Sequence, residues 1–323
     1  MTVALNSSQT ARRGQSVFWR RFRRSGPGKV GAVIVAVFVL LALLASTIKP
    51  YDPATDRDYR LNLKPPSIAA LWNKDVAETY TDPVTGQVNV WKAPFGTDNL
   101  GRDIATRVLH GARISLKVGV VSTLLALLLG SLLGVLAGYF GGFADTLIMR
   151  LVEVLSAIPE LFLLILLRAM FPLNANPILV FYIVVGLLAF ISWGGLARVV
   201  RGQILSGREQ DYVQAAKALG ASDARVIGQH LLPNSATYII ISLSLAIPGY
   251  ILLESGLSFI GIGIVEPYAS WGSLLKLAQD GGFESLDTRP WVLLPGVFIV
   301  LAVLGWQFVG DGLRDAFDPR RRR

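Results

Sequence analysis

The sequence contains no cysteine and only two histidines, His110 and His230, among its 323 residues. Disulfide bonds and thiolate metal sites are therefore excluded, and a histidine-built metal centre has too few ligands. Charged residues make up only 16% of the chain and hydrophobic residues 52%, which is too apolar for one soluble globule. The chain also lacks the Gly-x-x-x-x-Gly-Lys-Ser/Thr phosphate loop, so any nucleotide chemistry must come from a partner.

Basic residues gather at the two ends of the chain. The C-terminus ends in the run 320–323, and the N-terminal segment has no acidic residue among its basic ones, which are Arg12, Arg13, Arg20, Arg21, Arg23, Arg24 and Lys29. Such tails occur in nucleic-acid-binding proteins, but beside long apolar runs they favour the positive-inside topology of a membrane protein. We therefore expect no nucleic acid and a lipid bilayer as the surroundings.

Six apolar runs are long enough to cross a bilayer. The first, residues 30–48, has no charge and would extend about 28 Å as a helix. It is longer than the apolar part of a signal peptide and no Ala-x-Ala site follows, so it reads as an uncleaved anchor. The other five cover about 118–139, 149–167, 178–193, 238–264 and 291–309. The sequence thus predicts an all-α integral membrane protein with six transmembrane helices.

Counting the crossings places both termini in the cytoplasm. The expected organisation is a basic cytoplasmic tail (1–29), a first transmembrane helix (30–48), an extracytoplasmic region (49–111), a five-helix core (112–309) and a basic cytoplasmic tail (310–323). In the extracytoplasmic region prolines interrupt helix, and residues 87–91 alternate after the turn signal Thr85-Gly86, which predicts a small β-hairpin. The bias of Lys and Arg between residues 194–237 and 265–290 agrees with this orientation.

Three spans contain polar or small residues that break the apolar pattern. In the second, Gly130, Gly134 and Gly138 repeat every fourth residue and predict close packing with another helix. In the fifth, Pro248 frees a backbone carbonyl, and Glu254 and Ser258 lie one turn apart. This pair is typical of a pathway wall or of a structural hydrogen bond between helices.

The third span carries charges at steps of three and four residues. On one continuous helix Arg150, Glu153, Glu160 and Arg168 would share a face with Ala157 and Leu164. A charge near the bilayer centre costs roughly 2.5–3.5 kcal/mol on insertion scales, so we expect Glu160 to face a partner charge or a wet cavity. The alternative is that both arginines reach the membrane surfaces and the glutamates pair locally.

The stretch 214–234 is polar although it lies between two apolar spans. Residues 209–219 favour a helix that ends at Gly220 in left-handed geometry, and Ser222 is placed to cap a second helix that Pro233 stops or leads into the fifth span. Three interpretations remain: a DNA-binding helix-turn-helix, a passive connector, or a docking element for a soluble partner. A DNA reader needs a core and a basic recognition face that this loop lacks.

The same stretch resembles the EAA loop of ABC importer permeases. Gln214-Ala215-Ala216, then Gly220, then Leu232-Pro233 keep the spacing of that motif, with Gln214 in place of Glu and His230 in place of Ile. Other segments are similar to the second permease subunit of di- and oligopeptide (and nickel) importers, namely Phe22-Arg23-Arg24, Tyr51-Asp52-Pro53, Phe95-Gly96-Thr97-Asp98, Gly101-Arg102-Asp103, Ser270-Trp271-Gly272, Gly310-Asp311-Gly312-Leu313-Arg314-Asp315 and Asp318-Pro319-Arg320. Taken alone, Gly101-Arg102-Asp103 also reads as a turn held by a surface salt bridge worth under about 1 kcal/mol.

The resemblance implies a type I ABC importer (MetI-like) fold and a permease without catalytic residues or cofactors of its own. It implies four kinds of partner: a homologous second permease, two cytoplasmic ATPases that bind ATP and Mg, and an extracytoplasmic substrate-binding protein. The coupling loop, at about 208–234, would act through Gln214, Ala215, Ala216, Gly220, His230, Leu232 and Pro233. Candidate residues of the translocation path are Glu153, Glu160, Glu254 and Ser258. An ion-coupled secondary transporter, with the third span as its coupling site, is the alternative class.

Overall fold

The computed structural model describes residues 19–52, 55–172, 175–280, 282 and 287–317. The outer parts of both predicted basic tails lie outside the described residues, as do the motif residues Pro53 and 318–320. The long helices are α2 (Gly26–Ile48), α4 (Ile104–Phe140), α7 (Pro177–Arg208), α10 (Leu232–Phe259) and α13 (Leu294–Phe317). The shorter α-helices are α3 (Lys74–Thr79), α5 (Gly142–Ala157), α6 (Glu160–Ala169), α8 (Asp211–Ala218), α9 (Asp223–Val226) and α11 (Trp271–Asp280).

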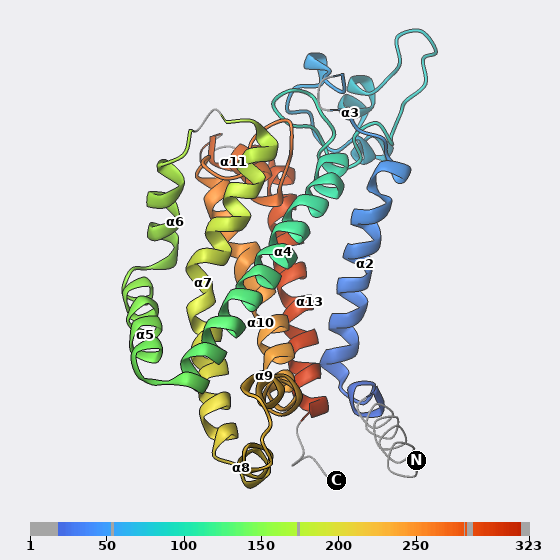
Figure 1. Ribbon diagram of the computed structural model, residues 1–323. Coiled ribbons are helices and arrows are strands. Elements are labelled where there is room, and N and C mark those ends of the chain that lie inside the picture. The colour runs from blue at the N-terminus through green and yellow to red at the C-terminus, as the bar shows by residue number, and fades with distance from the viewer. Residues whose placement is uncertain (1–18, 53–54, 173–174, 281, 283–286, 318–323) are drawn as a thin grey trace.

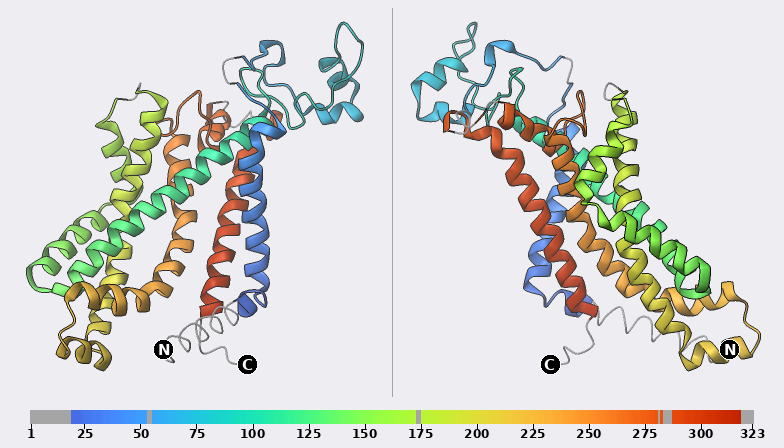
Figure 2. Two further views of the ribbon diagram at one scale, coloured as in Figure 1. Left: turned by 45° about the vertical axis from the view of Figure 1, so that its right-hand side comes forward. Right: turned by 90° about the vertical axis from the view of Figure 1, so that its left-hand side faces the viewer.

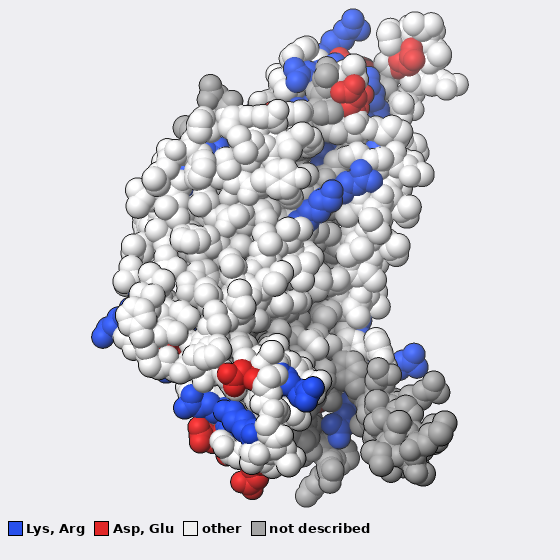
Figure 3. All heavy atoms as spheres, viewed as in Figure 1, with Lys and Arg blue, Asp and Glu red and all other residues white. Residues whose placement is uncertain are grey.

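The long helices run between two ends of the molecule (Figure 1). Residues 49–103, which we call the cap, lie at one end; α8 and α9 lie at the other, where α2 begins and α13 ends. Figure 2 shows the same division in two further views, with α4 strongly tilted across the bundle. Charged side chains gather at the two ends and leave a broad, largely uncharged belt between them (Figure 3). Such a belt is what a membrane-spanning bundle presents to lipid.

Five helical stretches in the described part of the chain are long and apolar enough to cross a membrane. The all-helical membrane fold predicted from the sequence is confirmed, but the third span is not one helix. It is divided between α5, which ends at Ala157, and α6, which begins at Glu160. Pro159 causes the break, because a proline disfavours helical geometry at the residue before it, and Ile158 is extended (φ −103°, ψ 132°).

The break overturns the expectation of one continuous charged face. Arg150 and Glu153 lie on α5, where they form an exposed ion pair at 2.8 Å, while Glu160 and Arg168 lie on α6. The local pairing considered from the sequence is thus present for Glu153. Glu160 occupies the first turn of α6 and is therefore not part of the charged face of α5.

The glycine row of the second span packs as predicted, and its partner is α7. A Cβ on Gly130, Gly134 or Gly138 would lie 2.7, 2.7 and 2.8 Å from the carbonyl oxygens of Trp193, Ala197 and Arg201, respectively. Real Cβ atoms do not approach backbone so closely, so these positions admit only glycine while the helices keep their spacing. The row fixes α4 and α7 as the central pair of the bundle.

The boundaries of the cap differ from those predicted. Helix α4 begins at Ile104 and not after residue 111, because Asp103 accepts hydrogen bonds from the backbone N–H groups of Ala105 and Thr106 (both 3.1 Å) and caps it. Helix α13 similarly continues to Phe317, inside the predicted tail. The predicted hairpin is reduced to a turn with one antiparallel bridge, between Thr81 and Val88.

The cap has a small apolar core of its own and is tied to the bundle. Leu61, Val76, Tyr80 and Ala93 are buried against one another; burial raises the pKa of the Tyr80 hydroxyl. Short 3₁₀ helices, η1 (Tyr59–Leu61) and η2 (Ser67–Leu71), complete the cap, and η4 (Pro290–Leu293) lies beside it before α13. The indole N–H of Trp291 in η4 donates to the carbonyl oxygen of Thr97 at 3.4 Å. The cap is therefore a packed unit and not a loose connection.

Candidate functional site

The stretch 208–234 forms a turn between two helices at the end opposite the cap. Helix α8 ends at Ala218, Gly220 has φ +84°, and α9 begins at Asp223. The sequence predicted this left-handed glycine, which glycine adopts without steric cost. The inner side is anchored by Val213 and Val226, both 0% exposed.

The outer side of this turn is open. Leu219 is 88% exposed, and Gln214 and Ala215 are also exposed. A Cβ on Gly220 would meet no atom within 4 Å, so only the backbone angle calls for glycine inside this chain. The Ser222 prediction is corrected: its backbone has N-cap geometry, but its side chain makes no cap hydrogen bond. On its outer side the turn thus exposes small, apolar and polar groups that no other part of the described chain covers.

The second helix of the turn leads directly into the membrane. Helix α9 continues through the π-helical segment η3 (Ile227–Leu231) into α10. Pro233 does not stop it; it directly follows the π-helical segment and stands at the start of α10 without ending the helix. Leu232 in that turn is half-buried beside Leu231. The alternative that Pro233 leads into the fifth span is therefore the correct one.

His230 stands where the resemblance expects an isoleucine. Its ring lies 6.1 Å from the ring of Tyr212 on α8. Both line a polar surface pocket of about 480 Å³ together with Pro233 and Asn234. Gln214, the other departure from the motif, donates from Nε2 to the carbonyl oxygen of Arg208 at 2.9 Å. Gln214 thus ties α8 to the end of α7, and His230 contacts α8 from η3. The pocket beside His230 stays accessible.

A second candidate region is a cavity of about 290 Å³ in the middle of the bundle, between α4, α6, α7 and α10. Its polar lining comes from Glu160, Thr123, Ser192, Ser242 and Tyr250. Glu160 lines this cavity and is itself exposed; that it belongs to a translocation path stays a prediction. Glu153 is exposed on α5 and does not line this cavity.

Glu254 and Ser258, the other two candidates for the path, lie in a buried hydrogen-bonded cluster. The Ser258 hydroxyl donates to Glu254 Oε1 at 2.7 Å and accepts from the Ile264 N–H at 2.9 Å. Ser115 on α4 donates to Glu254 Oε2 at 3.2 Å and accepts from the Trp271 N–H at 3.1 Å. Glu254 is 0% exposed and joins α4, α10 and the start of α11. This is the interhelical hydrogen bonding that the sequence left open as the alternative.

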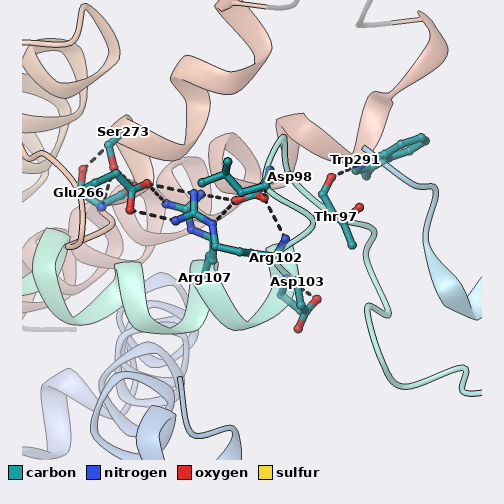
Figure 4. A network of polar contacts seen from close by, with 11 residues as sticks. Thr97, Asp98, Arg102, Asp103, Arg107, Glu266, Ser273 and Trp291 are labelled. Carbon is teal, nitrogen blue, oxygen red and sulfur yellow. Dashed lines mark hydrogen bonds and ion pairs between the residues drawn. The ribbon is translucent and has the colours of Figure 1, made fainter. Parts of the chain in front are cut away.

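Two carboxylates and two guanidinium groups form an ion cluster where the cap meets the bundle (Figure 4). Asp98 Oδ2 accepts from Arg102 Nε at 2.7 Å and from Arg107 Nη1 at 2.6 Å. Glu266, from the segment between α10 and α11, accepts from Arg102 Nη1 at 3.0 Å and Nη2 at 3.1 Å, and from Arg107 Nη2. Burial lowers the pKa of Arg102, but Glu266 and Asp98 outweigh it and the pKa lies above its ordinary value.

This cluster corrects the simplest interpretation of Gly101-Arg102-Asp103. The side chains of Arg102 and Asp98 are 2% and 0% exposed, so their ion pair is not a surface salt bridge. The pairing with Glu266 has no signal in the sequence, because Glu266 lies 164 residues from Arg102. Pro267 is a local sign of a turn at that place.

Comparisons with known proteins connect these features. Residues 130–323 match the family described as binding-protein-dependent transport system inner membrane component, and residues 16–66 match the N-terminal TM domain of oligopeptide transport permease C. The oligopeptide transport system permease protein OppC of Escherichia coli (strain K12) is 40% identical over 90% of this chain and 85% of its own length. OppC and the dipeptide transport system permease protein DppC of Bacillus subtilis (strain 168) are 37% and 38% identical, each over 94% of this chain and over 88% and 85% of their own lengths.

A solved structure, described as the crystal structure of an amino acid ABC transporter with histidines, resembles the chain more distantly. The TM-score is 0.48 at 17% identity, with 65% of this chain and 94% of that chain covered; this similarity carries no argument. The family match spans more than half of the sequence, and three relatives exceed 30% identity over nearly all of it. The chain therefore belongs to the family of binding-protein-dependent transport system inner membrane components, the multi-pass membrane permeases of ABC importers.

Proposed function

We propose that this permease forms half of the translocation pathway of an importer for di- or oligopeptides. The named transport systems of its relatives support peptides as the substrate class. Nickel and other small solutes are the competing cargoes. The observation that carries the proposal is the turn α8–Gly220–α9, whose inner side is packed and whose outer side no part of the described chain covers.

The turn serves as the docking element for a soluble ATPase subunit, which binds ATP and Mg. Small side chains at Ala215, Ala216 and Gly220 permit close approach of a partner surface. Since α9, η3 and α10 are continuous from Asp223 to Phe259, a displacement of the turn is transmitted along α10 to Gly249 and Tyr250, which line the central cavity. Differential contacts with the ATPases in their two states would thereby bias the pathway.

Glu160 is the residue we assign to the pathway. It lies in the central cavity among hydroxyl groups, where a second, homologous permease would complete the other half of the wall. Glu254 and Ser258 support this wall from behind through their hydrogen bonds to α4 and the segment before α11, and Glu153 lies at the exposed surface of α5. A cysteine at position 160 should react with a water-soluble reagent. Labelling only by lipid-soluble reagents, with transport unchanged, would remove Glu160 from the path.

The proposed orientation places the turn and both termini in the cytoplasm of a prokaryotic cell, and the cap outside with the substrate-binding protein. It rests on the basic tails and on the position of the cap at the end opposite the turn. Reporter fusions at residue 323 should be active on the cytoplasmic side, and a label at Trp91, which is 71% exposed, should react from outside. Outer-side activity of the fusion at residue 323 would overturn the orientation.

The substrate class is tested by uptake in a strain that lacks this permease. Restoring the chain should restore uptake of labelled tripeptides, and the purified protein should carry a second permease and ATPase subunits of the same importer. Nickel uptake without peptide uptake would reassign the cargo. Uptake that proceeds without ATPase subunits would contradict the importer mechanism itself.

A further inference from the structure

The ion cluster between Asp98, Arg102, Arg107 and Glu266 has one partner that differs from the others. The side chains of Arg102, Arg107 and Asp98 are 2%, 3% and 0% exposed, whereas that of Glu266 is 52% exposed. Asp98 also accepts from the backbone N–H groups of Leu100 at 2.8 Å and Arg102 at 2.9 Å. Asp98 is thus fixed within the fold, while Glu266 approaches the same two arginines from the solvent side.

The arginine pair faces a cavity. A hollow of about 670 Å³ is bounded by both arginines, by Glu266, and by Lys276 and Asp280 of α11. Its volume is within the range of roughly 300–1,000 Å³ found for small-molecule sites. It lies at the cap end of the core helices, between the starts of α4 and α7 and the segment from α10 to α11, where a solute entering from the cap side would arrive.

Both arginines already hold a carboxylate at this place. Arg102 donates to Glu266 from Nη1 and Nη2, and Arg107 donates to it from Nη2. Guanidinium groups pair with carboxylates through two parallel N–H···O bonds, which point charges such as lysine do not offer. The chemistry of the site therefore suits a second carboxylate, the group that the two arginines already bind.

We infer that this cavity is a binding site for the C-terminal carboxylate of the transported peptide, which takes the place of Glu266 on Arg102 and Arg107. This inference rests on the proposed peptide function. The exchange keeps the net charge of the cluster unchanged, because one carboxylate replaces another. It needs the half-exposed Glu266 side chain to turn into water while the incoming carboxylate takes over its hydrogen bonds, and the buried pair with Asp98 stays intact.

The freed Glu266 carboxylate would remain at the rim of the cavity. Its segment is also held by the Ile264 N–H bonded to Ser258, so the backbone has an anchor that does not depend on the arginines. Lys276 and Asp280, which also line the cavity, pair with each other at 3.4 Å. Asp280 thus supplies a carboxylate that lines the same cavity but contacts neither arginine in the structure, and it provides a matched control.

The test uses the complete importer in nanodiscs without its substrate-binding protein, so that the permease alone meets the ligand. Binding of labelled trialanine and of trialaninamide is compared for the wild type, Glu266→Gln and Asp280→Asn. Removing the competing carboxylate should tighten trialanine binding about tenfold, which corresponds to the loss of one charge-assisted pair. Binding of the amide should stay unchanged, and Asp280→Asn, which removes a carboxylate that touches neither arginine, should tighten trialanine binding less than Glu266→Gln does.

Equal changes for acid and amide, an equal gain in Asp280→Asn, or no tightening in Glu266→Gln would each overturn the carboxylate site. Recovery of ATPase activity with Glu266→Gln verifies that the complex is assembled. The same preparations, with the binding protein added, are assayed for trialanine uptake. If the wild type takes up trialanine but Glu266→Gln does not bind it more tightly than the wild type, only this site is refuted. If Glu266→Gln binds trialanine more tightly but the wild type takes none up, only the peptide function is refuted.

Discussion

Gly101 in the cap and Gly220 in the turn have nearly the same backbone and opposite surroundings. Their φ angles are +71° and +84°, which L side chains rarely adopt. A Cβ on Gly101 would lie 1.7 Å from the carbonyl oxygen of Asp58, whereas one on Gly220 would meet nothing within 4 Å. Gly101 is required both by its backbone angle and by packing inside the chain. Gly220 is required by its backbone angle alone, and the space beside it is open.

The side chains at the two ends repeat this difference. In the cap, Asp98 and Arg102 are buried and paired with each other. At the turn, Leu219 is an apolar side chain that is 88% exposed. Substitution of a side chain that is buried and paired within the chain should lower the stability of the protein. Substitution of a side chain that is exposed on the turn should instead affect assembly of the importer and transport. The following predictions test that separation.

The largest effect is expected from Asp98→Asn, which leaves Arg102 and Arg107 without their shared buried anion. Breaking a buried pair in this way costs about 3–5 kcal/mol, so little folded protein should be recovered and its thermal unfolding should occur at a much lower temperature. Glu209→Gln, which removes an exposed partner of Arg208, should change stability by less than about 1 kcal/mol. Similar stability of both variants would show that the cap cluster is not a structural centre.

Gly134→Ala should lower stability by about 1–3 kcal/mol, because overpacked contacts must be relieved by moving α4 from α7. Gly186→Ala is the control: it places the same methyl group on α7, where nothing lies within 4 Å. That change should be neutral or stabilising by up to about 1 kcal/mol. Unfolding temperatures measured in one detergent compare the two, and equal losses would contradict close packing as the role of the glycine row.

Gly220→Val should reduce ATPase recovery or coupled uptake about tenfold, equivalent to about 1.4 kcal/mol of coupling free energy, while the protein stays in the membrane. Gly86→Val is a matched control, since Gly86 also has positive φ (+67°) and open space around it, but lies in the cap. Both variants carry the same kind of backbone strain. Loss of coupling in both, or in neither, would mean that the turn is a passive connector.

The smallest effect is expected for Ser222→Ala, at less than about 0.5 kcal/mol, because the hydroxyl makes no cap bond. Asn73→Ala in the cap should cost about 0.5–2 kcal/mol, since the Asn73 amide oxygen accepts from the N–H of Asp75 at 3.0 Å and Val76 at 3.4 Å. Comparing the thermal unfolding of both variants tests whether helix capping distinguishes the two ends.

Local and periodic signals in the sequence predict much of this fold. The four-residue glycine spacing predicts a close helix contact, and the left-handed Gly220 follows from its place between two helical patterns. The break at Pro159 also has a local signal, but the three- and four-residue spacing of charges on either side of it favours one continuous helix, which was the wrong prediction. Proline removes a donor and restricts its predecessor, which a charge pattern does not offset.

The rest depended on contacts between distant segments. Glu266 meets Arg102 only after α10 and α11 have packed against α4, and Glu254 meets Ser115 across 139 residues. Neither pairing has a spacing that sequence periodicity can report. The candidate site was predictable at the turn, where its residues are consecutive. It was only partly predictable in the central cavity, where Thr123, Glu160, Ser192 and Tyr250 come from four helices.

The most direct test of the docking turn uses the absence of cysteine from the sequence. Leu219→Cys introduces a single thiol at the exposed tip of the turn, and a matching Val84→Cys introduces one at a cap position that is 91% exposed. In native membranes a short reagent that joins a thiol to an amine should link position 219, and not position 84, to an ATPase subunit, identified by mass spectrometry and by its nucleotide-binding sequence. Linkage of position 84 to the ATPase, or no ATPase adduct at position 219, would contradict the account.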